Sequence, residues 1–342
     1  MKRVLTFLFS LLLACSAYGQ FKKAKPKSIF RALQYDRIVG VAIETNLDSI
    51  INHRNRNTYQ KGFFTYGDYN GKIYRETIKL RPRGKFRRRA CDFPMIKIDF
   101  SKTTLKEQGY AKFDDYKLVT HCMNNVMSSY ESIAREYLAY KLYNILSPNS
   151  YKVQFLYITY IDNQSTIPDF QHFGFIIEDT AELADRMGGK SRKEMAGLTP
   201  DSLDIVQHDF VALFQYLIGN TDWVAHPIPR NVKAIKSKGA TKYMVVPFDF
   251  DFAGLVAAPY AVPSNSLNQR SIRHRIFQGI SEDPKDLESS IAHFLSKKRK
   301  ILRYIKRFTL LSKASRKDIL DFIKPFFEEI ESGSLQGTGE NG

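Results

Sequence analysis

The chain has 342 residues, 43% of them hydrophobic, and its 52 Lys and Arg outnumber its 35 Asp and Glu, which gives a formal net charge of +17. This composition supplies enough apolar residues for one large core or two lobes, and it excludes a chain that is disordered throughout. The excess of positive charge favours anionic partners such as phosphorylated ligands, anionic lipid, polysaccharide or nucleic acid.

The N-terminus has the pattern of an export signal. Lys2-Arg3 precede an apolar run over residues 4–14, which is too short to span a bilayer. The sequence A-Y-G before Gln20 favours a signal peptide at 1–19, and L-L-A-C, ending at Cys15, is the alternative: a lipoprotein signal that leaves a lipid anchor on that cysteine. No later segment is apolar enough to cross a membrane. We therefore expect an exported protein in the periplasm, at the outer membrane surface or outside the cell.

Two further cysteines, Cys91 and Cys122, lie outside the signal. An oxidising compartment would allow them to form a disulfide. Two unpaired, buried cysteines are the equally weighted alternative at this point.

Residues 20–179 are expected to form a β-rich part with one main helix. Apolar residues at helical spacing predict that helix over Tyr130–Leu146, and Ser147-Pro148-Asn149 ends it. Alternating patterns and turn residues predict strands at 38–45, 62–66, 72–81, 95–100, 151–161 and 172–177.

Residues 180–331 are expected to be mainly helical, with a boundary between the two parts near Asp179. Thr199 and Pro200 have the pattern of a helix start, and the predicted helix carries an apolar stripe on to Leu217. Two or three amphipathic helices are predicted over 286–331. The Gly-rich segment 332–342 is expected to be a disordered tail.

The stretch from Leu217 to Leu255 carries the most informative polar residues. It reads as a helix end, a polar loop and two strands joined by a turn. Two polar clusters are predicted at the mouth of this hairpin: Asp222 with Asn231, and Asp249 with Asp251. Hard oxygen ligands of this kind suit Mg²⁺ and the positioning of a hydroxyl nucleophile.

Several motifs, in order along residues 75 to 260, together resemble the CotH family of secreted atypical kinases and, more distantly, HipA-type kinases. They are L-R-P-R-G-K with F-P-M-I-K-I-D-F, A-R-E-Y-L-A-Y-K-L-Y, G-F-I-I-E, I-G-N-T-D-W and V-P-F-D-F-D-F-A-G. The resemblance implies an α+β, protein-kinase-like two-lobe fold with a β-rich N-terminal lobe and a mainly helical C-terminal lobe. It also implies ATP and Mg²⁺ as cofactors.

The resemblance assigns roles to the polar residues of the hairpin. Asp222 would orient or deprotonate the acceptor hydroxyl. Asn231 and Asp249 would hold Mg²⁺ on the nucleotide phosphates, with Asp251 beside them.

The resemblance also assigns the nucleotide-binding residues. Lys97 would contact the α- and β-phosphates and be held by Glu136, with Glu131 as the weaker candidate. The remaining assignments are Arg81, Arg83 and Gly84 over the phosphates, and Ile177 and Glu178 at the adenine edge.

Two features depart from the kinase pattern. Ordinary protein kinases place the metal-binding Asn five residues after the catalytic Asp, whereas here Pro227 occupies that position and Asn231 lies nine residues after Asp222. Gly84 stands alone where a run of glycines is usual.

We expect an exported kinase that transfers phosphate from Mg-ATP to Ser or Thr hydroxyls of envelope or surface proteins. One alternative is a catalytically inactive binding module of the same fold that serves in envelope assembly. The other is a basic surface protein that grips a polyanion through the segment 81–89. DNA is not an expected partner.

Overall fold

The computed structural model describes residues 26–68, 70–283 and 285–335. The predicted signal peptide, the possible lipid anchor at Cys15 and residues 336–342 of the predicted tail lie outside the described residues. Within the described ranges, no helix combines the length and hydropathy that are needed to span a membrane.

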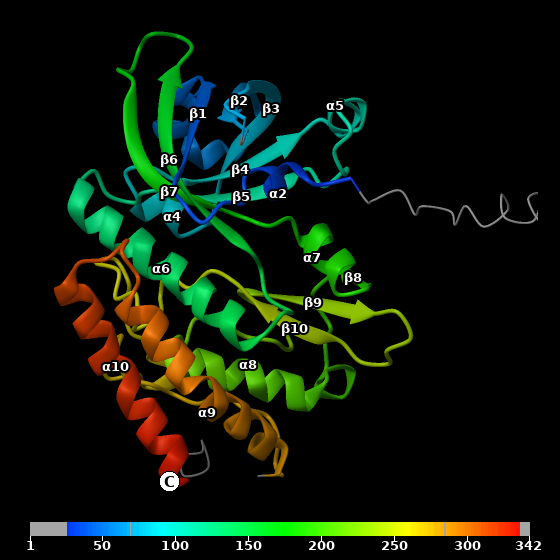
Figure 1. The fold of residues 1–342 in the computed structure, drawn as a ribbon, viewed down its shortest axis with the longest axis vertical. Coiled ribbons are helices and arrows are strands. Elements are labelled where there is room, and N and C mark those ends of the chain that lie inside the picture. Colours follow the sequence, from blue (N-terminus) through cyan, green and yellow to red (C-terminus); the bar gives the residue numbers. More distant parts are fainter. Residues whose placement is uncertain (1–25, 69, 284, 336–342) are drawn as a thin grey trace, which may run out of the picture.

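Seven strands of the N-terminal part close into a barrel in the order β1-β2-β3-β4-β5-β7-β6 (Figure 1). The first strand, β1 (Val39–Thr45), pairs antiparallel with β2 (Gln60–Gly67) on one side and parallel with β6 (Val153–Asp162) on the other. The other strands are β3 (Ile73–Arg83), β4 (Met95–Phe100), β5 (Asp115–Val119) and β7 (Phe170–Ile177). Alternate residues of the strands fill the interior, among them Ile43, Phe64, Ile98, Leu118 and Ile158.

The predicted protein-kinase-like two-lobe fold is wrong. The expected α+β class and the six predicted strands are present, but the strands form a closed barrel, with β1 parallel to β6 and Val41 opposite Ile158. Periodicity shows which residues of a strand face the core, but it does not show which strands pair. The pairing that closes this barrel joins segments more than a hundred residues apart, which no local pattern reports.

One short helix precedes the barrel, and other short helices join its strands. They are α2 (Ile29–Ala32), α3 (Leu47–Ile51), the 3₁₀ turn η2 (Arg54–Arg56), α4 (Arg87–Ala90) and α5 (Lys102–Glu107). The side chain of Ser101 caps α5 by accepting a hydrogen bond from the backbone of Thr104.

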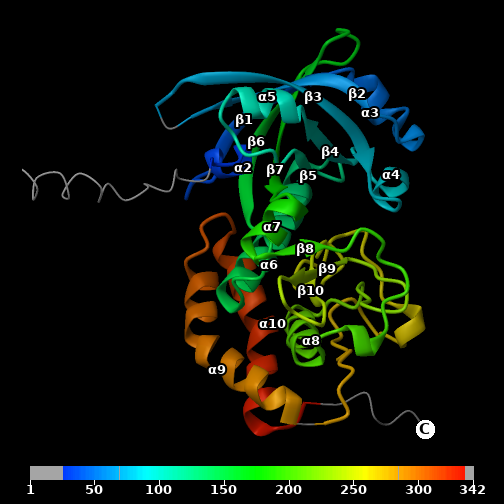
Figure 2. The same ribbon diagram turned by 90° about the vertical axis from the view of Figure 1, so that its right-hand side faces the viewer.

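The predicted main helix is confirmed as α6 (Val126–Leu146). It lies between the barrel and the C-terminal helices (Figure 2). Ala134, Leu138 and Leu142 are completely buried, because α6 packs against β6 and β7 on one side and against a C-terminal helix on the other.

The C-terminal part combines helices with a three-stranded sheet in the order β10-β9-β8. Its helices are α7 (Thr180–Arg186), α8 (Ile205–Ile218), α9 (Lys285–Lys306) and α10 (Lys313–Ser332), with 3₁₀ turns η3 (Pro200–Ser202) and η4 (Asn265–Leu267). Its strands are β8 (Gly189–Ser191), β9 (Val232–Ser237) and β10 (Met244–Pro247). The predicted polar hairpin is therefore β9–β10. The placement of a domain boundary near Asp179 stays a prediction.

The helix predicted to start at Thr199 begins later than expected. Thr199 and Pro200 form only the short turn η3, after which Leu203 is extended and bridges to Tyr243. The helix α8 starts after Asp204, whose carboxylate accepts a hydrogen bond from the backbone N–H of Gln207. The sequence thus contains two successive N-capping patterns, and the second one begins the long helix.

Cys91 and Cys122 form a disulfide, with Cα atoms 4.6 Å apart and a sequence separation of 31 residues. It links the end of α4 to the loop after β5, and both sulfur-bearing residues are buried. A disulfide in this position is consistent with an oxidising, extracytoplasmic location.

Reduction of this disulfide is expected to lower the free energy of unfolding by roughly 3 to 4 kcal/mol, because the unfolded chain regains the freedom of a closed loop of this length. Urea unfolding with and without a thiol reductant measures the change. The double variant Cys91→Ala/Cys122→Ala is the control, and its stability should not respond to the reductant. Equal stability of the oxidised and reduced wild-type protein would contradict the expectation.

Candidate functional site

A basic cavity of about 680 Å³ lies where the rim of the barrel meets β8, β9 and α7. Its lining includes three of the predicted site residues, Arg81, Arg83 and Lys97, together with Lys117 and Lys233. A second cavity of about 700 Å³ lies beside α2, α5 and α7, and none of the predicted site residues lines it. We therefore take the first cavity as the candidate site, on chemistry rather than size.

The cations of the cavity are positioned by the register of three neighbouring strands. Arg81 of β3 lies opposite Lys97 of β4, and Lys97 lies opposite Lys117 of β5. Direct cross-strand partners share one face of a sheet, and like charges opposite each other are destabilising. Asp115 offsets part of the repulsion through an ion pair of 2.8 Å with the Nζ of Lys97. The row is an arrangement that a bound anion would stabilise.

Lys117 is the main functional candidate that the sequence reasoning missed. Burial, helped by the nearby Arg83, lowers the pKa of Lys117 to about 8. Its Nζ lies 5.4 Å from the ring centroids of both Tyr151 and Phe248 and 3.3 Å from the Oγ1 of Thr180. The alternation in D-Y-K-L-V, with buried residues on either side of this lysine, was the signal that could have placed it on a strand.

Lys233 of β9 faces the same cavity from the opposite side. Burial lowers the pKa of Lys233, and Arg83 and Lys97 act in the same direction. Burial is the larger cause of both lowered pKa values, and the neighbouring cations add to it.

The expected pairing of Lys97 with Glu136 is not formed. The Nζ of Lys97 contacts Asp115 instead; burial lowers the pKa of Lys97, but the hydrogen bond with Asp115 outweighs this and the net shift is upward. The weaker candidate, Glu131, forms an ion pair of 2.7 Å with Arg135.

Glu136 belongs to a buried cluster with Arg87, Asp251 and Tyr260. Burial raises the pKa of Glu136 well above its ordinary value, and the nearby Asp251 adds to the shift. The Nε of Arg87 lies 3.3 Å from the Oδ2 of Asp251, which also accepts a hydrogen bond of 3.2 Å from the hydroxyl of Tyr260. Burial, with the charge of Asp249, raises the pKa of Asp251 to about 7. Asp251 is thus engaged with Arg87, although the sequence placed it beside the metal.

The loop after α8 holds Asp222 in a fixed position. Gly219 ends α8 in the left-handed conformation, with φ of 64°. The carboxylate of Asp222 forms an ion pair of 3.0 Å with the Nε of Arg230 and accepts a hydrogen bond of 2.9 Å from the Nδ2 of Asn231. Burial raises the pKa of Asp222 and Arg230 lowers it, with a net upward shift. The structure thus brings Asp222 and Asn231 together as predicted, in spite of the longer loop.

Asn231 and Asp249 flank the mouth of the β9–β10 hairpin. The backbone N–H of Phe248 donates a hydrogen bond of 3.0 Å to the carbonyl oxygen of Asn231. Both residues have positive φ, 54° for Asn231 and 68° for Asp249, which is an uncommon conformation for residues other than glycine. The hydroxyl of Tyr140 on α6 accepts a hydrogen bond from the backbone of Asp249. Strain of this kind is often found at functional sites.

The donor set at this mouth is compatible with Mg²⁺ bound through a nucleotide. Both hydrogens that Asn231 donates go to Asp222, so its side-chain carbonyl oxygen stays available as an acceptor. The carboxylate of Asp249 makes no hydrogen bond or ion pair with another described residue. Within the described ranges, no cluster of three or more His, Cys, Asp and Glu could hold a metal ion alone. Mg²⁺ commonly takes one or two protein oxygens and completes its shell with phosphates and water.

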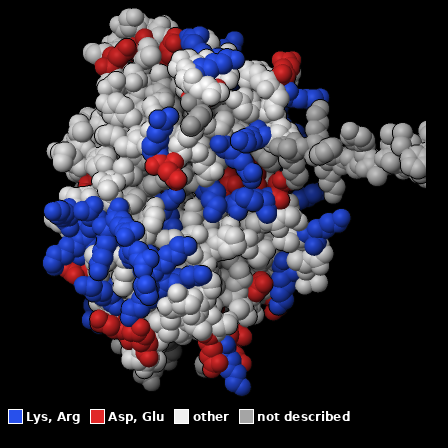
Figure 3. Space-filling view, in the orientation of Figure 1, with Lys and Arg blue, Asp and Glu red and all other residues white. Residues whose placement is uncertain are grey.

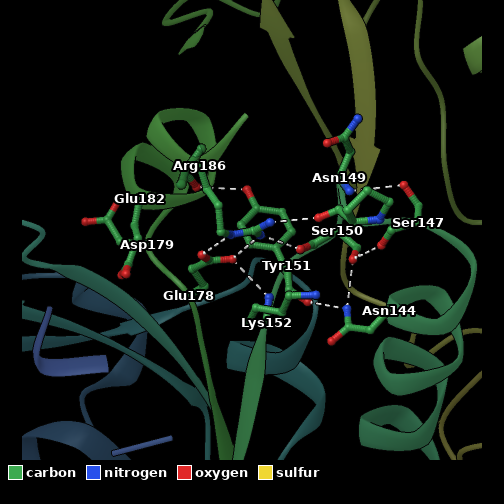
Figure 4. Close-up of polar contacts among 12 residues, drawn as sticks. Asn144, Ser147, Asn149, Ser150, Tyr151, Lys152, Glu178, Asp179, Glu182 and Arg186 are labelled. Atoms are coloured by element: carbon green, nitrogen blue, oxygen red, sulfur yellow. Dashed lines mark hydrogen bonds and ion pairs between the residues drawn. The ribbon is translucent and has the colours of Figure 1, made fainter. Parts of the chain in front are cut away.

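The predicted adenine-edge residues Ile177 and Glu178 lie at the end of β7, and Figure 4 shows the surroundings of Glu178. Arg186 donates to both carboxylate oxygens of Glu178, at 2.9 and 2.8 Å, and the backbone of Lys152 donates to one of them. Ile177 is buried and pairs with Lys117 and Val153. The side chain of Glu178 therefore ties α7 to the start of β6. Neither Ile177 nor Glu178 lines the basic cavity, so the structure does not bring the predicted adenine-edge residues to the predicted phosphate-binding residues.

The segment predicted to cover the phosphates turns sharply at Gly84, which has φ of 78° and is exposed. Arg83 lies before this turn, and Arg81 hydrogen-bonds to the side chain of Asn57 at the cavity rim. After the turn, the ring of Phe86 packs against Phe252 at a centroid distance of 5.1 Å. This contact connects the turn to the chain that follows Asp251.

No protein-family model and no curated protein sequence matches this chain.

Replacement of Arg87 by Met is expected to destabilise the protein by about 3 to 5 kcal/mol at pH 8, because it leaves the buried carboxylates of Glu136 and Asp251 without their cation. Both folded-state pKa values are raised, so protonation relieves this cost as the pH falls. The loss should therefore be smaller at pH 5 than at pH 8, as measured by urea unfolding at both values.

Arg89→Met is the matched control, since Arg89 belongs to the same short helix and is exposed. It should change the free energy of unfolding by no more than about 0.5 kcal/mol. An Arg87→Met loss that is the same at both pH values would show that the charges of this cluster do not govern its stability.

Proposed function

We propose that the basic cavity binds a nucleoside triphosphate together with Mg²⁺, and that the protein transfers the terminal phosphoryl group to a hydroxyl acceptor. The observation that carries this proposal is the cation row of Arg81, Lys97 and Lys117, connected through Phe248 to Asp249 at the hairpin mouth. Phosphoryl transfer depends mainly on positioning and on neutralising phosphate charge, and the site offers both.

The cavity residues would bind and orient the phosphates. Lys117 and Lys233 approach from opposite walls, and Arg83 and Lys97 complete the set. A phosphate bound among them would raise the pKa of Lys117 toward its ordinary value. Because the charged lysine is more stable with the phosphate bound, this change would make binding more favourable.

Asn231 and Asp249 would hold Mg²⁺ against the phosphates through their side-chain oxygens. When bound, the ion would neutralise negative charge on the phosphates during transfer. Both residues have positive φ, which places these oxygens at the hairpin mouth at a local conformational cost. Backbone strain of this kind clusters at functional sites.

Asp222 would orient the acceptor hydroxyl and take up its proton at a carboxylate oxygen. The acceptor oxygen then bonds to the terminal phosphorus while the bond from that phosphorus to the bridging oxygen breaks, which leaves a nucleoside diphosphate. Arg230 and Asn231 hold the carboxylate in place. The raised pKa of Asp222 improves its strength as a base near neutral pH.

The acceptor that best fits an exported protein is a Ser or Thr hydroxyl of an envelope or surface protein. Support for this part comes from the sequence motifs that resemble CotH kinases and from the disulfide. The closed barrel differs from the fold that the resemblance implied, so the fold lends the proposal no support.

Lys117→Met is expected to abolish stabilisation by ATP and to raise the melting temperature of the ligand-free protein. The variant removes a charge whose burial is unfavourable, as its lowered pKa shows. Wild-type protein at 100-fold saturation should gain about 2.7 kcal/mol, measured as a thermal shift. Lys242→Met, at an exposed lysine on the β9–β10 turn, is the control and should retain the full shift. A full ATP shift in Lys117→Met would contradict the cavity assignment.

Two further variants separate binding from transfer. Asp249→Asn is expected to keep the fold and to lose only the Mg²⁺-dependent part of the ATP shift. Asp222→Asn is expected to keep the whole shift and to lose transfer of labelled phosphate to the protein or to an added acceptor by at least about 100-fold. Nucleotide binding with no transfer in wild-type protein would favour the alternative of a catalytically inactive binding module.

A further inference from the structure

A second basic region lies far from the cavity, on the C-terminal helices. Ten of the twenty-one residues from Lys297 to Lys317 are Lys or Arg, and none is Asp or Glu. They belong to the second half of α9, the turn after it and the first turns of α10. In Figure 3 Lys and Arg cover the face of the molecule where these elements lie. We call this region the α9–α10 basic face.

Most of these cations point to solvent without an acidic neighbour. Lys298 forms an ion pair with Glu331, and Lys317 forms one with Asp321. The others make no ion pair with any described residue. Arg299, Lys300, Arg303, Lys306, Arg307 and Lys313 are all exposed. Self-repulsion of so many unpaired charges disfavours the folded state, and a large anionic partner would relieve it.

A shallow groove of about 460 Å³ runs along this stretch of α9. Leu295 and Leu302 form its apolar part, and both are only partly buried. The rest of its lining consists of Lys298, Arg299, Arg303 and Lys306. These six residues recur at helical spacing, so apolar and cationic groups face outward from one stripe of the helix.

Exposed apolar side chains lie at the edge of the same face. Met127 is 76% exposed and Val126 is 54% exposed, at the first turn of α6. One turn further, the hydroxyl of Tyr130 donates a hydrogen bond of 2.6 Å to the carbonyl oxygen of Leu310, in the turn between α9 and α10. This bond places the start of α6 against the turn that carries the basic residues.

We propose that the α9–α10 basic face docks on the surface of an anionic lipid bilayer. Cations attract the phosphate headgroups, while Met127, Val126 and the groove leucines reach the boundary between headgroups and acyl chains. A soluble polyanion would use the charges but would gain nothing from the exposed apolar residues. The inference is independent of phosphoryl transfer, because none of its residues lines the basic cavity.

The test is co-sedimentation with vesicles of phosphatidylcholine alone and of phosphatidylcholine with phosphatidylglycerol, at low and high salt. Wild-type protein should bind only the anionic vesicles and should bind them less tightly at high salt. Each cation near the surface contributes about 1 kcal/mol, or roughly fivefold in affinity. The triple variant Arg299→Gln/Arg303→Gln/Lys306→Gln should therefore bind about 100-fold more weakly.

The control triple variant Lys61→Gln/Lys238→Gln/Lys242→Gln removes the same charge from exposed lysines elsewhere and should bind like the wild type. Val126→Ser/Met127→Ser should weaken vesicle binding about tenfold and leave binding to immobilised heparin unchanged. Absence of binding to anionic vesicles, or equal losses in both triple variants, would overturn the proposal. Binding to heparin but not to vesicles would assign the face to a soluble polyanion and would also overturn it.

Discussion

The parallel pairing of β1 with β6 is the contact on which the N-terminal architecture depends. It closes the sheet, so the described barrel has no open edge between these strands to be protected from other chains. Closure also fixes β7, because β7 pairs with β6 on one side and β5 on the other. Lys117 is thereby set opposite Ile177, directly before the chain leaves the barrel. The basic cavity lies at this exit, so its position follows from how the barrel closes.

In the cavity and at the neighbouring mouth of the β9–β10 hairpin, several local interactions oppose stability. Three cations lie side by side across β3, β4 and β5, and only Lys97 has a carboxylate partner at short distance. Asn231 and Asp249 both adopt positive φ. Repulsion between like charges in the cavity and backbone strain at the hairpin mouth both raise the free energy of the folded state, and they occur at neighbouring positions. The buried cluster of Arg87, Glu136 and Asp251 lies next to this site and, unlike the cation row, it combines opposite charges.

The sequence predicted local elements well and long-range partners poorly. The strand at 95–100 and the helix ending at Leu146 have strong periodicity, and both are confirmed. The proximity of Asp222 and Asn231 was also predicted, and the structure achieves it through a bridge between Val224 and Arg230 that folds the loop back. The barrel closure was not, since it depends on pairing between distant segments.

The sequence also failed to predict which cation lies near the side chain of Glu136. The residue was expected to hold Lys97, but the cation whose charge acts on its carboxylate is Arg87, on the short helix after Gly84. That helix begins within a basic run, and nothing in the sequence of this run distinguishes Arg87 from its neighbours Arg88 and Arg89. Charge composition reports how many cations a segment has, and only the fold decides which of them become buried.

The two basic runs of this chain have similar compositions, but the backbone geometry of each run determines where its cationic side chains lie. In the run 79–89, β3 alternates sides, so Arg81 and Arg83 face the cavity, while Arg87 enters the interior after the turn at Gly84. The run that begins at Lys297 lies on a helix whose other face packs on the core through Ile301 and Ile305, so its charges remain outside. The run 81–89 is therefore divided between the cavity, the interior and the solvent, and polyanion binding through it stays a prediction. The helical run keeps its cations together on one side, because a helix can bury one stripe and still present cations over an arc of its circumference.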